Sequence, residues 1–143
     1  MVGRVLSGET GAELSLEGVN QALTTEELSG LKKTASQVRV DPSIIDYAVR
    51  LVSATRGSSA IIETGAGPRG SLALIRCARC RALMEHRDYV IPDDIKALAV
   101  PVLIHRISLS AESDLEGINE VRAVEALLSQ VHTPRTEISG EDN

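Results

Sequence analysis

The chain has 143 residues, which suits one domain of ordinary size with some extra sequence at its ends. It carries a formal net charge of −5 and contains no Phe, no Trp and two Tyr. A nucleic-acid-binding surface needs clustered Lys and Arg, often with aromatic stacking platforms, so nucleic acid is not an expected partner. Because no apolar run approaches roughly 18 residues, the chain start does not resemble a signal peptide, and only two cysteines occur, we expect a cytoplasmic chain without a membrane span.

The apolar residues make up 43% of the chain and are mainly Leu, Ile, Val and Ala, which suit packed helices. We therefore predict an all-α fold, a compact bundle of about five helices. Residues 1–23 are glycine-rich and are predicted to be a flexible linker, and residues 134–143 a disordered, polar tail. The helical domain is expected to span residues 24–133.

The first helix is predicted to begin at Thr24, because Thr24 and Glu27 have the spacing of a capping box. Its apolar face is formed by residues at helical spacing: Leu28, Leu31, Ala35 and Val38. The second helix is predicted to begin at Asp41, an acidic N-cap that Pro42 follows at the first helical position. Its buried stripe is expected to contain Ile44, Ala48, Leu51, Val52 and Thr55.

The segment 56–67 contains several glycines and serines and is predicted to be a loop. A third helix is predicted to run from Pro68 to about Glu85. Because it is apolar on most sides, we expect it to be central and buried. Its apolar residues are Leu72, Leu74, Ile75, Ala78, Ala82 and Leu83.

After a short extended connection, a fourth helix is predicted from Pro92 to about Arg106, with acidic residues in its first turn. A kink is expected at Pro101, which removes one backbone hydrogen bond. An acidic loop is predicted at 108–116, and a fifth helix at about 119–130. The fifth helix is expected to bury Val121, Val124, Leu127 and Leu128.

The most informative segment for function is 65–70, where a glycine-containing loop ends at Pro68 and Arg69 follows at once. A cation is disfavoured at a helix N-terminus, which already carries about half a positive charge, so an anion is expected to compensate. Free backbone N–H groups, the helix dipole and a guanidinium together favour phosphate binding. Arg76 falls on the same helix face and extends the positive stripe. The alternative is an exposed Arg69 that reaches into solvent or pairs with an acidic residue.

Other combinations of reactive residues point to structural roles. Cys77 and Cys80 have CxxC spacing, but they fall inside a predicted helix without a second pair, so packing in the core is predicted. The histidines show no metal-binding or catalytic spacing: His86, His105 and His132. The acidic residues of the 108–116 loop are expected to be solvated, and no metal site is expected. No GxxxxGK[ST] loop occurs, so the chain is not expected to hold a nucleotide by itself.

Four segments match a set of known motifs in order. Residues 65–69 read GAGPR and precede a Leu-, Ala- and Arg-rich helix; residues 87–95 read RDYVIPDDI, and residues 102–107 read VLIHRI. Residues 47–56, YAVRLVSATR, come before them. These segments resemble the GASPR, GRDYVTPEDV and VLxHRI motifs of MoxR-type AAA+ ATPases and the helix that precedes the first motif.

The resemblance implies a C-terminal helical lid at residues 24–133 that packs over ATP bound to a P-loop core. Residues 1–23 would then be a linker or the end of the missing ATPase core. In that family the Arg of GASPR is the sensor-2 arginine, which approaches the nucleotide phosphates. The resemblance gives this role to Arg69, with Pro68 and Gly67 beside it in the binding site.

For the whole protein, the resemblance implies ATP hydrolysis, with ATP and Mg²⁺ bound mainly by the core. It further implies a homo-oligomeric ring, a chaperone-like role in the assembly or maturation of partner proteins, and possible von Willebrand A-domain partners. This chain contains no Walker A, Walker B or arginine finger, so by itself it is expected to be inactive. It would be either part of a longer protein or a stand-alone lid-like module.

The chain departs from the family pattern at four positions. Gly67 replaces Ser, Gly70 replaces Ala, His86 replaces Gly, and Ile91 replaces the Thr that would cap the fourth helix. The acids that follow Ile91 are expected to offset part of the lost capping. None of the departures removes Arg69.

Two other functions are compatible with the sequence. The first is a stand-alone helical protein-interaction module without a nucleotide role, which would use the acidic loop 108–116 and the loop 56–67 for recognition. The second is a helix-turn-helix DNA reader, which the negative charge and the lack of a basic recognition face disfavour.

Overall fold

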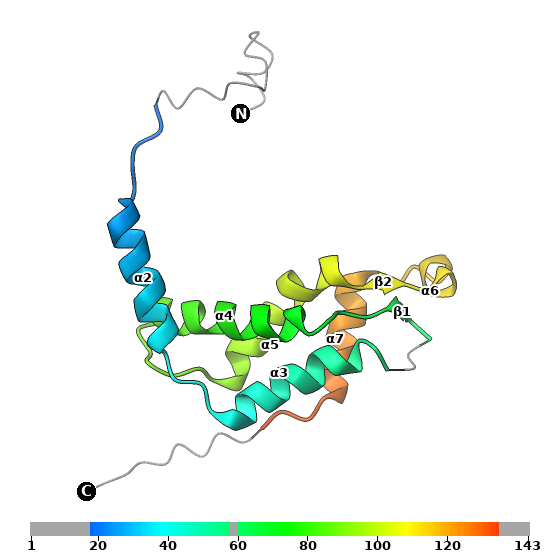
Figure 1. Ribbon diagram of the computed structural model, residues 1–143. Helices are drawn as coiled ribbons and strands as arrows, with labels where there is room; N and C mark the ends of the chain where they lie inside the picture. Colours follow the sequence, from blue (N-terminus) through cyan, green and yellow to red (C-terminus); the bar gives the residue numbers. More distant parts are fainter. Residues whose placement is uncertain (1–17, 58–59, 135–143) are drawn as a thin grey trace, which may run out of the picture. The chain divides into compact units, whose positions relative to one another are not determined.

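The computed structural model describes residues 18–57 and 60–134, and helices account for most of them (Figure 1). The helices are α2 (Thr25–Gln37), α3 (Pro42–Ala54), α4 (Arg69–Met84), α5 (Pro92–Leu103), α6 (Ala111–Leu115) and α7 (Glu120–Gln130), with a 3-10 turn, η1 (Ile104–Arg106), after α5. Two short strands, β1 (Ile62–Thr64) and β2 (Ser108–Leu109), complete the fold. The predicted all-α class is confirmed.

The chain divides into two compact units, Met1–Leu31 and Lys32–Asn143, and the boundary falls within α2. The hydrophobic core belongs to the second unit, where α3, α4, α5 and α7 pack against one another. No aromatic residue other than Tyr47 contributes to the core, which is otherwise built from aliphatic side chains. Its largest fully buried aliphatic residues are Ile44, Leu51, Leu74, Ile95 and Leu103.

The helix starts agree with the sequence signals. Thr24 and Glu27 form a reciprocal capping box, in which Glu27 N donates to Thr24 Oγ1 at 3.1 Å and Thr24 N donates to Glu27 Oε2 at 2.7 Å. Asp41 caps α3 by accepting a hydrogen bond from Ser43 N at 2.8 Å. The Ser43 hydroxyl also donates to Asp41 Oδ1. The bond from this hydroxyl and, to a smaller extent, the bond from Ser43 N lower the pKa of the Asp41 carboxyl. Both predicted caps are confirmed.

Asp94 replaces the missing cap at the start of α5. The Ile91 side chain has no polar atom, but Ile91 N donates to Asp94 Oδ2 at 2.9 Å, so the acidic half of a capping box is present. The expected compensation for the absent Thr is therefore confirmed. The helix then contains Pro101 and passes into η1 at Ile104, so the predicted fourth helix ends as a 3-10 turn.

The burial of α4 differs from the prediction. Its buried residues are four apart and form a single stripe: Gly70, Leu74, Ala78 and Ala82. Leu72 is 58% exposed, because two helical positions turn its side chain about 200° from that of Leu74. The helix is therefore fully buried along one face only, and the expectation that Leu72 is buried was wrong.

Two other apolar faces are less buried than predicted. Leu28 and Leu31 of α2 are 44% and 47% exposed, whereas Ala35 and Val38 are buried, because the first half of α2 contributes no residue to the hydrophobic core. In α7 the buried stripe contains Ala123, Val124 and Leu127, and Leu128 is half-buried. Val121 lies at the exposed margin of that stripe, and the prediction that it is buried was wrong.

A short antiparallel sheet replaces parts of two predicted loops. Strand β1 pairs with β2, with Ile62 opposite Leu109 and Thr64 opposite Ser108. Ser110 extends the pairing, because its N–H donates to Ile61 O and its hydroxyl donates to Ala60 O. The segments predicted as loops at 56–67 and 108–116 are thus partly ordered as strands, and the second also contains α6.

The termini are described only in part. Residues 18–23 have no helix or strand, and residues 1–17 of the predicted linker lie outside the described residues. The same holds for residues 135–143 of the predicted tail. Within the described ranges, no helix is long and apolar enough to cross a membrane.

Candidate functional site

The candidate site lies at the start of α4, where Pro68 occupies the N-cap and Arg69 is the first helical residue. The Arg69 side chain is exposed and has no ion pair or hydrogen bond with any residue that the structure describes. This arrangement excludes pairing with a described acidic residue and leaves the guanidinium available to an external anion. Arg69 thus lies where the sequence predicts it, at the positive end of the helix dipole.

Some of the backbone N–H groups at the start of α4 already have partners. Gly70 N donates to Gly67 O at 2.8 Å, and Ser71 N donates to Pro68 O at 3.1 Å. Leu72 N also donates to Pro68 O, and Pro68 itself has no N–H. The turn at Gly67 and Pro68 thus occupies these three N–H groups, whereas Gly67 N and Arg69 N have no hydrogen-bond partner among the described residues and remain free, as the sequence predicts.

Two residues at the C-terminal end of α3 hold the segment that precedes Arg69. Thr55 Oγ1 accepts a hydrogen bond from Ala66 N at 2.8 Å and donates one to Val52 O at 2.6 Å. Arg56 Nη1 donates to Ala66 O at 2.6 Å. Both polar groups of the Ala66 backbone are therefore bound, and we call Thr55, Arg56 and Ala66 the α3 clamp. Sequence reasoning placed Thr55 in the buried stripe but missed the clamp, for which the only sequence signal is a Thr-Arg pair directly before the glycine-containing loop.

The glycines of the segment have distinct spatial requirements. A Cβ atom on Gly65 would lie 2.3 Å from the Thr55 carbonyl oxygen, so the segment approaches α3 more closely than any other residue type permits. A Cβ on Gly70 would touch side chains of the core at 3.4 Å or more. A Cβ on Gly67 would meet nothing within 4 Å. The close approach of the segment to α3 therefore requires glycine at position 65, whereas position 67 has room for a side chain.

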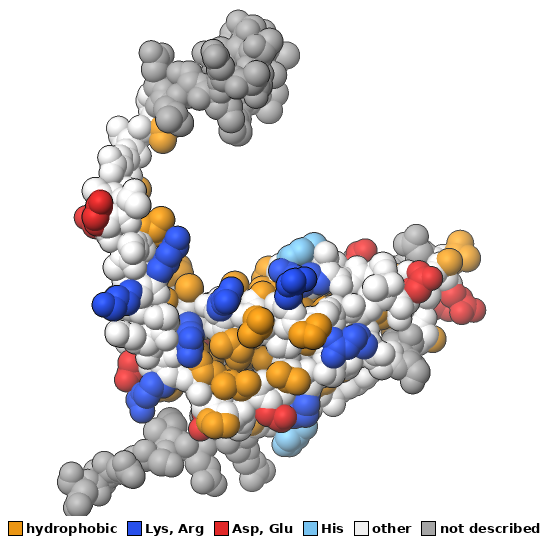
Figure 2. All heavy atoms as spheres, viewed as in Figure 1, with side chains coloured by type: hydrophobic (Ala, Val, Ile, Leu, Met, Phe, Trp, Pro, Cys, Tyr) orange, Lys and Arg blue, Asp and Glu red, His pale blue; other side chains and the backbone are white. Residues whose placement is uncertain are grey.

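Further positive charge lies along α4. Arg76 is exposed and, like Arg69, has no ion pair within the described ranges. Figure 2 shows Lys and Arg side chains around a patch of apolar side chains on the face of α3 and α4 that is in view. This face thus carries several basic side chains although the whole chain is negatively charged.

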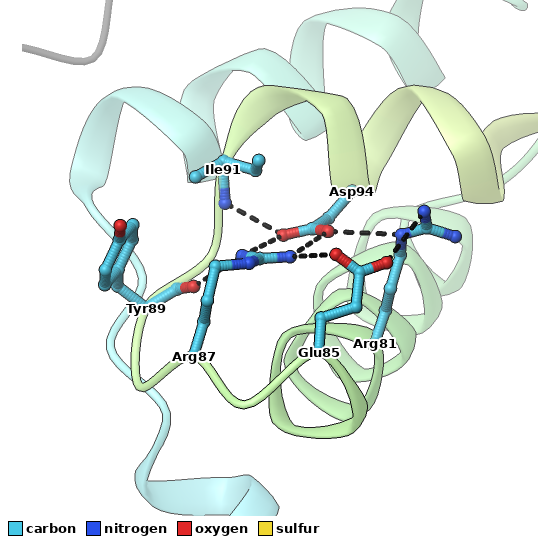
Figure 3. A network of polar contacts seen from close by, with 6 residues as sticks. All are labelled: Arg81, Glu85, Arg87, Tyr89, Ile91 and Asp94. Atoms are coloured by element: carbon cyan, nitrogen blue, oxygen red, sulfur yellow. Dashed lines mark hydrogen bonds and ion pairs between the residues drawn. The ribbon is translucent and has the colours of Figure 1, made fainter.

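An ion-pair network around one buried carboxylate lies at the opposite end of α4 (Figure 3). Asp94, whose side chain is 1% exposed, pairs with Arg87 and also lies 3.2 Å from Arg81 Nε, where the contact is an ion pair and not an aligned hydrogen bond. Glu85 pairs with both arginines. The hydrogen bond to Asp94 is the main cause of the raised pKa of Arg87. All charges in the network are matched internally, so it stabilises the connection from α4 to α5 and offers no site for a ligand.

The remaining candidates have no arrangement for catalysis. Cys77 is half-buried against the core, as predicted, but Cys80 is exposed because it lies off the buried stripe of α4, and the prediction that it packs in the core was wrong. His86 adopts a positive φ of 57°, the conformation that favours the glycine found in the related motif. Among residues 18–57 and 60–134, no three His, Cys, Asp or Glu side chains gather in a way that could hold a metal ion.

Comparisons with known proteins agree with the fold and the motif order. The AAA lid domain family matches residues 45–127. The chain is 40% identical over 119 residues to the uncharacterized protein YeaC of Bacillus subtilis, covering 83% of this chain and 37% of that protein. It is 34% identical over 123 residues to the chaperone MoxR1 of Mycobacterium tuberculosis, covering 80% and 33% respectively.

A solved structure supports the same assignment. The crystal structure of a candidate ATPase from Cytophaga hutchinsonii superposes with a TM-score of 0.72 at 30% sequence identity, over 77% of this chain and 36% of that one. This chain therefore spans about a third of the length of each of these three proteins. By family match, motif order and fold, the chain belongs to the AAA lid domain family, in the form found in MoxR-type AAA+ ATPases.

Proposed function

We propose that this chain serves as the lid of a MoxR-type AAA+ ATPase and supplies Arg69 as the sensor-2 arginine. The observation that carries the proposal is the guanidinium of Arg69 at the first position of α4, which is exposed and has no partner among the described residues, in a chain of the AAA lid domain family. A P-loop core, which this sequence does not contain, would bind ATP and Mg²⁺.

The chemistry that Arg69 would perform is electrostatic. In phosphoryl transfer, negative charge spreads over the oxygens of the transferred group, and a preorganised cation stabilises it. Arg69 would contact the terminal phosphate while ATP is bound and lose that contact after hydrolysis. The position of the lid would thereby depend on the state of the nucleotide.

The names of three relatives support the chaperone part of a wider proposal. One relative is named a chaperone and two others are named MoxR, from Methylorubrum extorquens and Paracoccus denitrificans. We propose that the complete ATPase is a cytoplasmic homo-oligomeric ring that assists the assembly or maturation of partner proteins, including proteins with von Willebrand A domains. Its core is the first partner of this lid.

The test is ATP hydrolysis by the assembly that contains this lid together with its nucleotide-binding core. Arg69→Ala should lower kcat about 10²-fold, the effect of removing one preorganised donor of charge stabilisation, while circular dichroism shows an unchanged helical content. Arg122→Ala is the matched control, because Arg122 is also exposed and its side chain has no ion pair among the described residues. A kcat within twofold of wild type for Arg69→Ala would remove the sensor-2 assignment.

A second measurement separates the lid from the interaction module. Isothermal titration of the isolated chain with ATP should give binding weaker than millimolar, because a single arginine binds a triphosphate poorly in water. Addition of the core should then produce ATP binding that depends on Arg69. An assembly whose ATP affinity and turnover are the same with and without this chain would support the interaction module instead.

A further inference from the structure

The α3 clamp provides an inference about how Arg69 is held. Ala66 is fully buried. Two consecutive residues of the clamp bind its backbone, Thr55 at the N–H and Arg56 at the carbonyl. Thr55 is also fully buried. Among the described residues, its hydroxyl donates a hydrogen bond only to Val52 O and accepts one only from Ala66 N. Buried polar groups with all their hydrogen bonds made have one preferred geometry, and the clamp therefore fixes Ala66 in one position on α3.

Little backbone freedom remains between Ala66 and Arg69. Arg69 follows Ala66 by three residues, and the Pro68 ring between them fixes one backbone angle. Gly67 O accepts from Gly70 N, which closes the turn directly after the clamp. Gly65, which precedes Ala66, permits the chain to lie close to the end of α3, because any Cβ at this position would collide with Thr55 O.

We propose that Thr55 and Arg56 are positioning residues for Arg69, which set the direction from which its guanidinium meets the nucleotide phosphates. The inference rests on the proposed function, since it concerns the same site. Neither Thr55 nor Arg56 contacts the nucleotide in this proposal. They act by holding the segment 65–68, and a misplacement of about 1 Å at a reacting group can reduce a rate by up to about 10²-fold.

The hydroxyl of Thr55 is tested by two substitutions of similar size. Thr55→Val keeps the shape and leaves Ala66 N–H without its acceptor, and it should lower kcat for ATP hydrolysis about tenfold in the assembled ATPase. Thr55→Ser keeps the hydroxyl and should restore kcat to within about twofold of wild type. If Thr55→Val retains a kcat within about twofold of wild type, the hydroxyl does not position Arg69 and this part of the inference is wrong.

Arg56 provides a second test that leaves the core intact, because its side chain is exposed. Arg56→Ala removes the hydrogen bonds to Ala66 O and to Ser53 Oγ and should lower kcat about three- to tenfold, while circular dichroism shows an unchanged helical content. Arg39→Ala is the matched control, since Arg39 precedes the other end of α3 and its only ion pair among the described residues joins the exposed Asp88. Equal kcat values for the Arg56→Ala and Arg39→Ala variants would overturn the role of Arg56.

A double-mutant cycle shows whether the clamp acts through Arg69. In the Arg69→Ala background, Thr55→Val and Arg56→Ala should each change kcat by less than twofold, because the group that they position is absent. A further tenfold loss in that background would show that the clamp acts by another route and would overturn the inference alone. If Arg69→Ala itself has no effect on kcat, the proposed function fails and the inference fails with it.

Discussion

Arg87 and Asp94 form a two-point ion pair: Arg87 Nη1 lies 2.9 Å from Asp94 Oδ2, and Arg87 Nη2 lies 2.7 Å from Asp94 Oδ1 (Figure 3). The Asp94 side chain is 1% exposed and the Arg87 side chain 17% exposed, so water replaces neither partner easily. Such a pair does not by itself make a protein more stable than an apolar pair would, but the loss of one partner leaves an uncompensated charge in the interior.

Replacement of Asp94 should therefore strongly destabilise the chain. We expect Asp94→Ala to lower the free energy of unfolding by about 3 kcal/mol, measured by urea denaturation with circular dichroism. Asp93→Ala is the control, because Asp93 is 76% exposed and pairs only with Lys96 among the described residues. Its loss should lower the free energy of unfolding by less than about 1 kcal/mol. If the two variants lose similar amounts of unfolding free energy, the buried pair contributes no more to stability than the exposed one.

The chain is expected to be more stable with phenylalanine in place of Tyr47. Its side chain is fully buried, and its hydroxyl has no hydrogen-bond partner in the described structure, so removal of the hydroxyl relieves a desolvation penalty. Tyr47→Phe should raise the free energy of unfolding by about 1 kcal/mol and the melting temperature by a few degrees. Tyr89→Phe, at a half-buried position, should change it by less than about 0.5 kcal/mol. A less stable Tyr47→Phe variant would show that the hydroxyl has a partner after all.

Two glycines of the site should differ sharply in their tolerance of alanine. Gly65→Ala should lower the free energy of unfolding by about 2 kcal/mol, because its Cβ would overlap the Thr55 carbonyl and the backbone would have to move. Gly67→Ala should leave stability unchanged or slightly higher, because its Cβ would meet nothing within 4 Å and alanine restricts the unfolded chain. Thermal melts of both variants check this, and equal tolerance at the two positions would contradict the close approach to α3.

The acid stability of the chain should depend on the cap of α3. The pKa of Asp41 is lowered in the folded state, so its contribution to stability is fully present above the unfolded value of 3.8 and is lost as the pH falls through the lower folded value. Wild type should therefore exceed Asp41→Asn in stability by a constant amount above about pH 5. The difference should shrink below pH 3.8, as measured by urea denaturation between pH 2 and pH 7. A difference that is independent of pH would show that the ionised carboxylate has no advantage over the amide.

The helix starts were predictable because their signals lie in adjacent residues. Thr24 with Glu27, and Asp41 with Pro42, are complete within one helical turn, and the structure contains both caps. The buried stripe of α3 was also predictable from its spacing, apart from Tyr47. Periodicity identifies an apolar face, but it does not say whether another element covers that face, as the exposure of Leu72 shows.

The features that depend on distant partners could not be predicted. Strand β1 has three residues and exists only because β2 pairs with it more than 40 residues later in the chain. The α3 clamp similarly joins Thr55 to Ala66 across a loop, and the buried state of Asp94 depends on two arginines that precede it in α4 and in the following connection. The motif around Arg69 predicts where the candidate site lies, whereas the contacts that hold this segment involve residues outside the motif.

A backbone bridge of the parallel type between Arg39 and Tyr89 has a consequence for the core of the lid. Arg39 N donates to Asp88 O, and Val90 N donates to Arg39 O. From this common point the chain enters α3 and α5 with the same offset, since Pro42 and Pro92 each come three residues after their bridged residue. Main-chain hydrogen bonds therefore fix the start of α3 relative to the start of α5. Substitutions of side chains along their packed faces should leave this lengthwise alignment of the two helices unchanged.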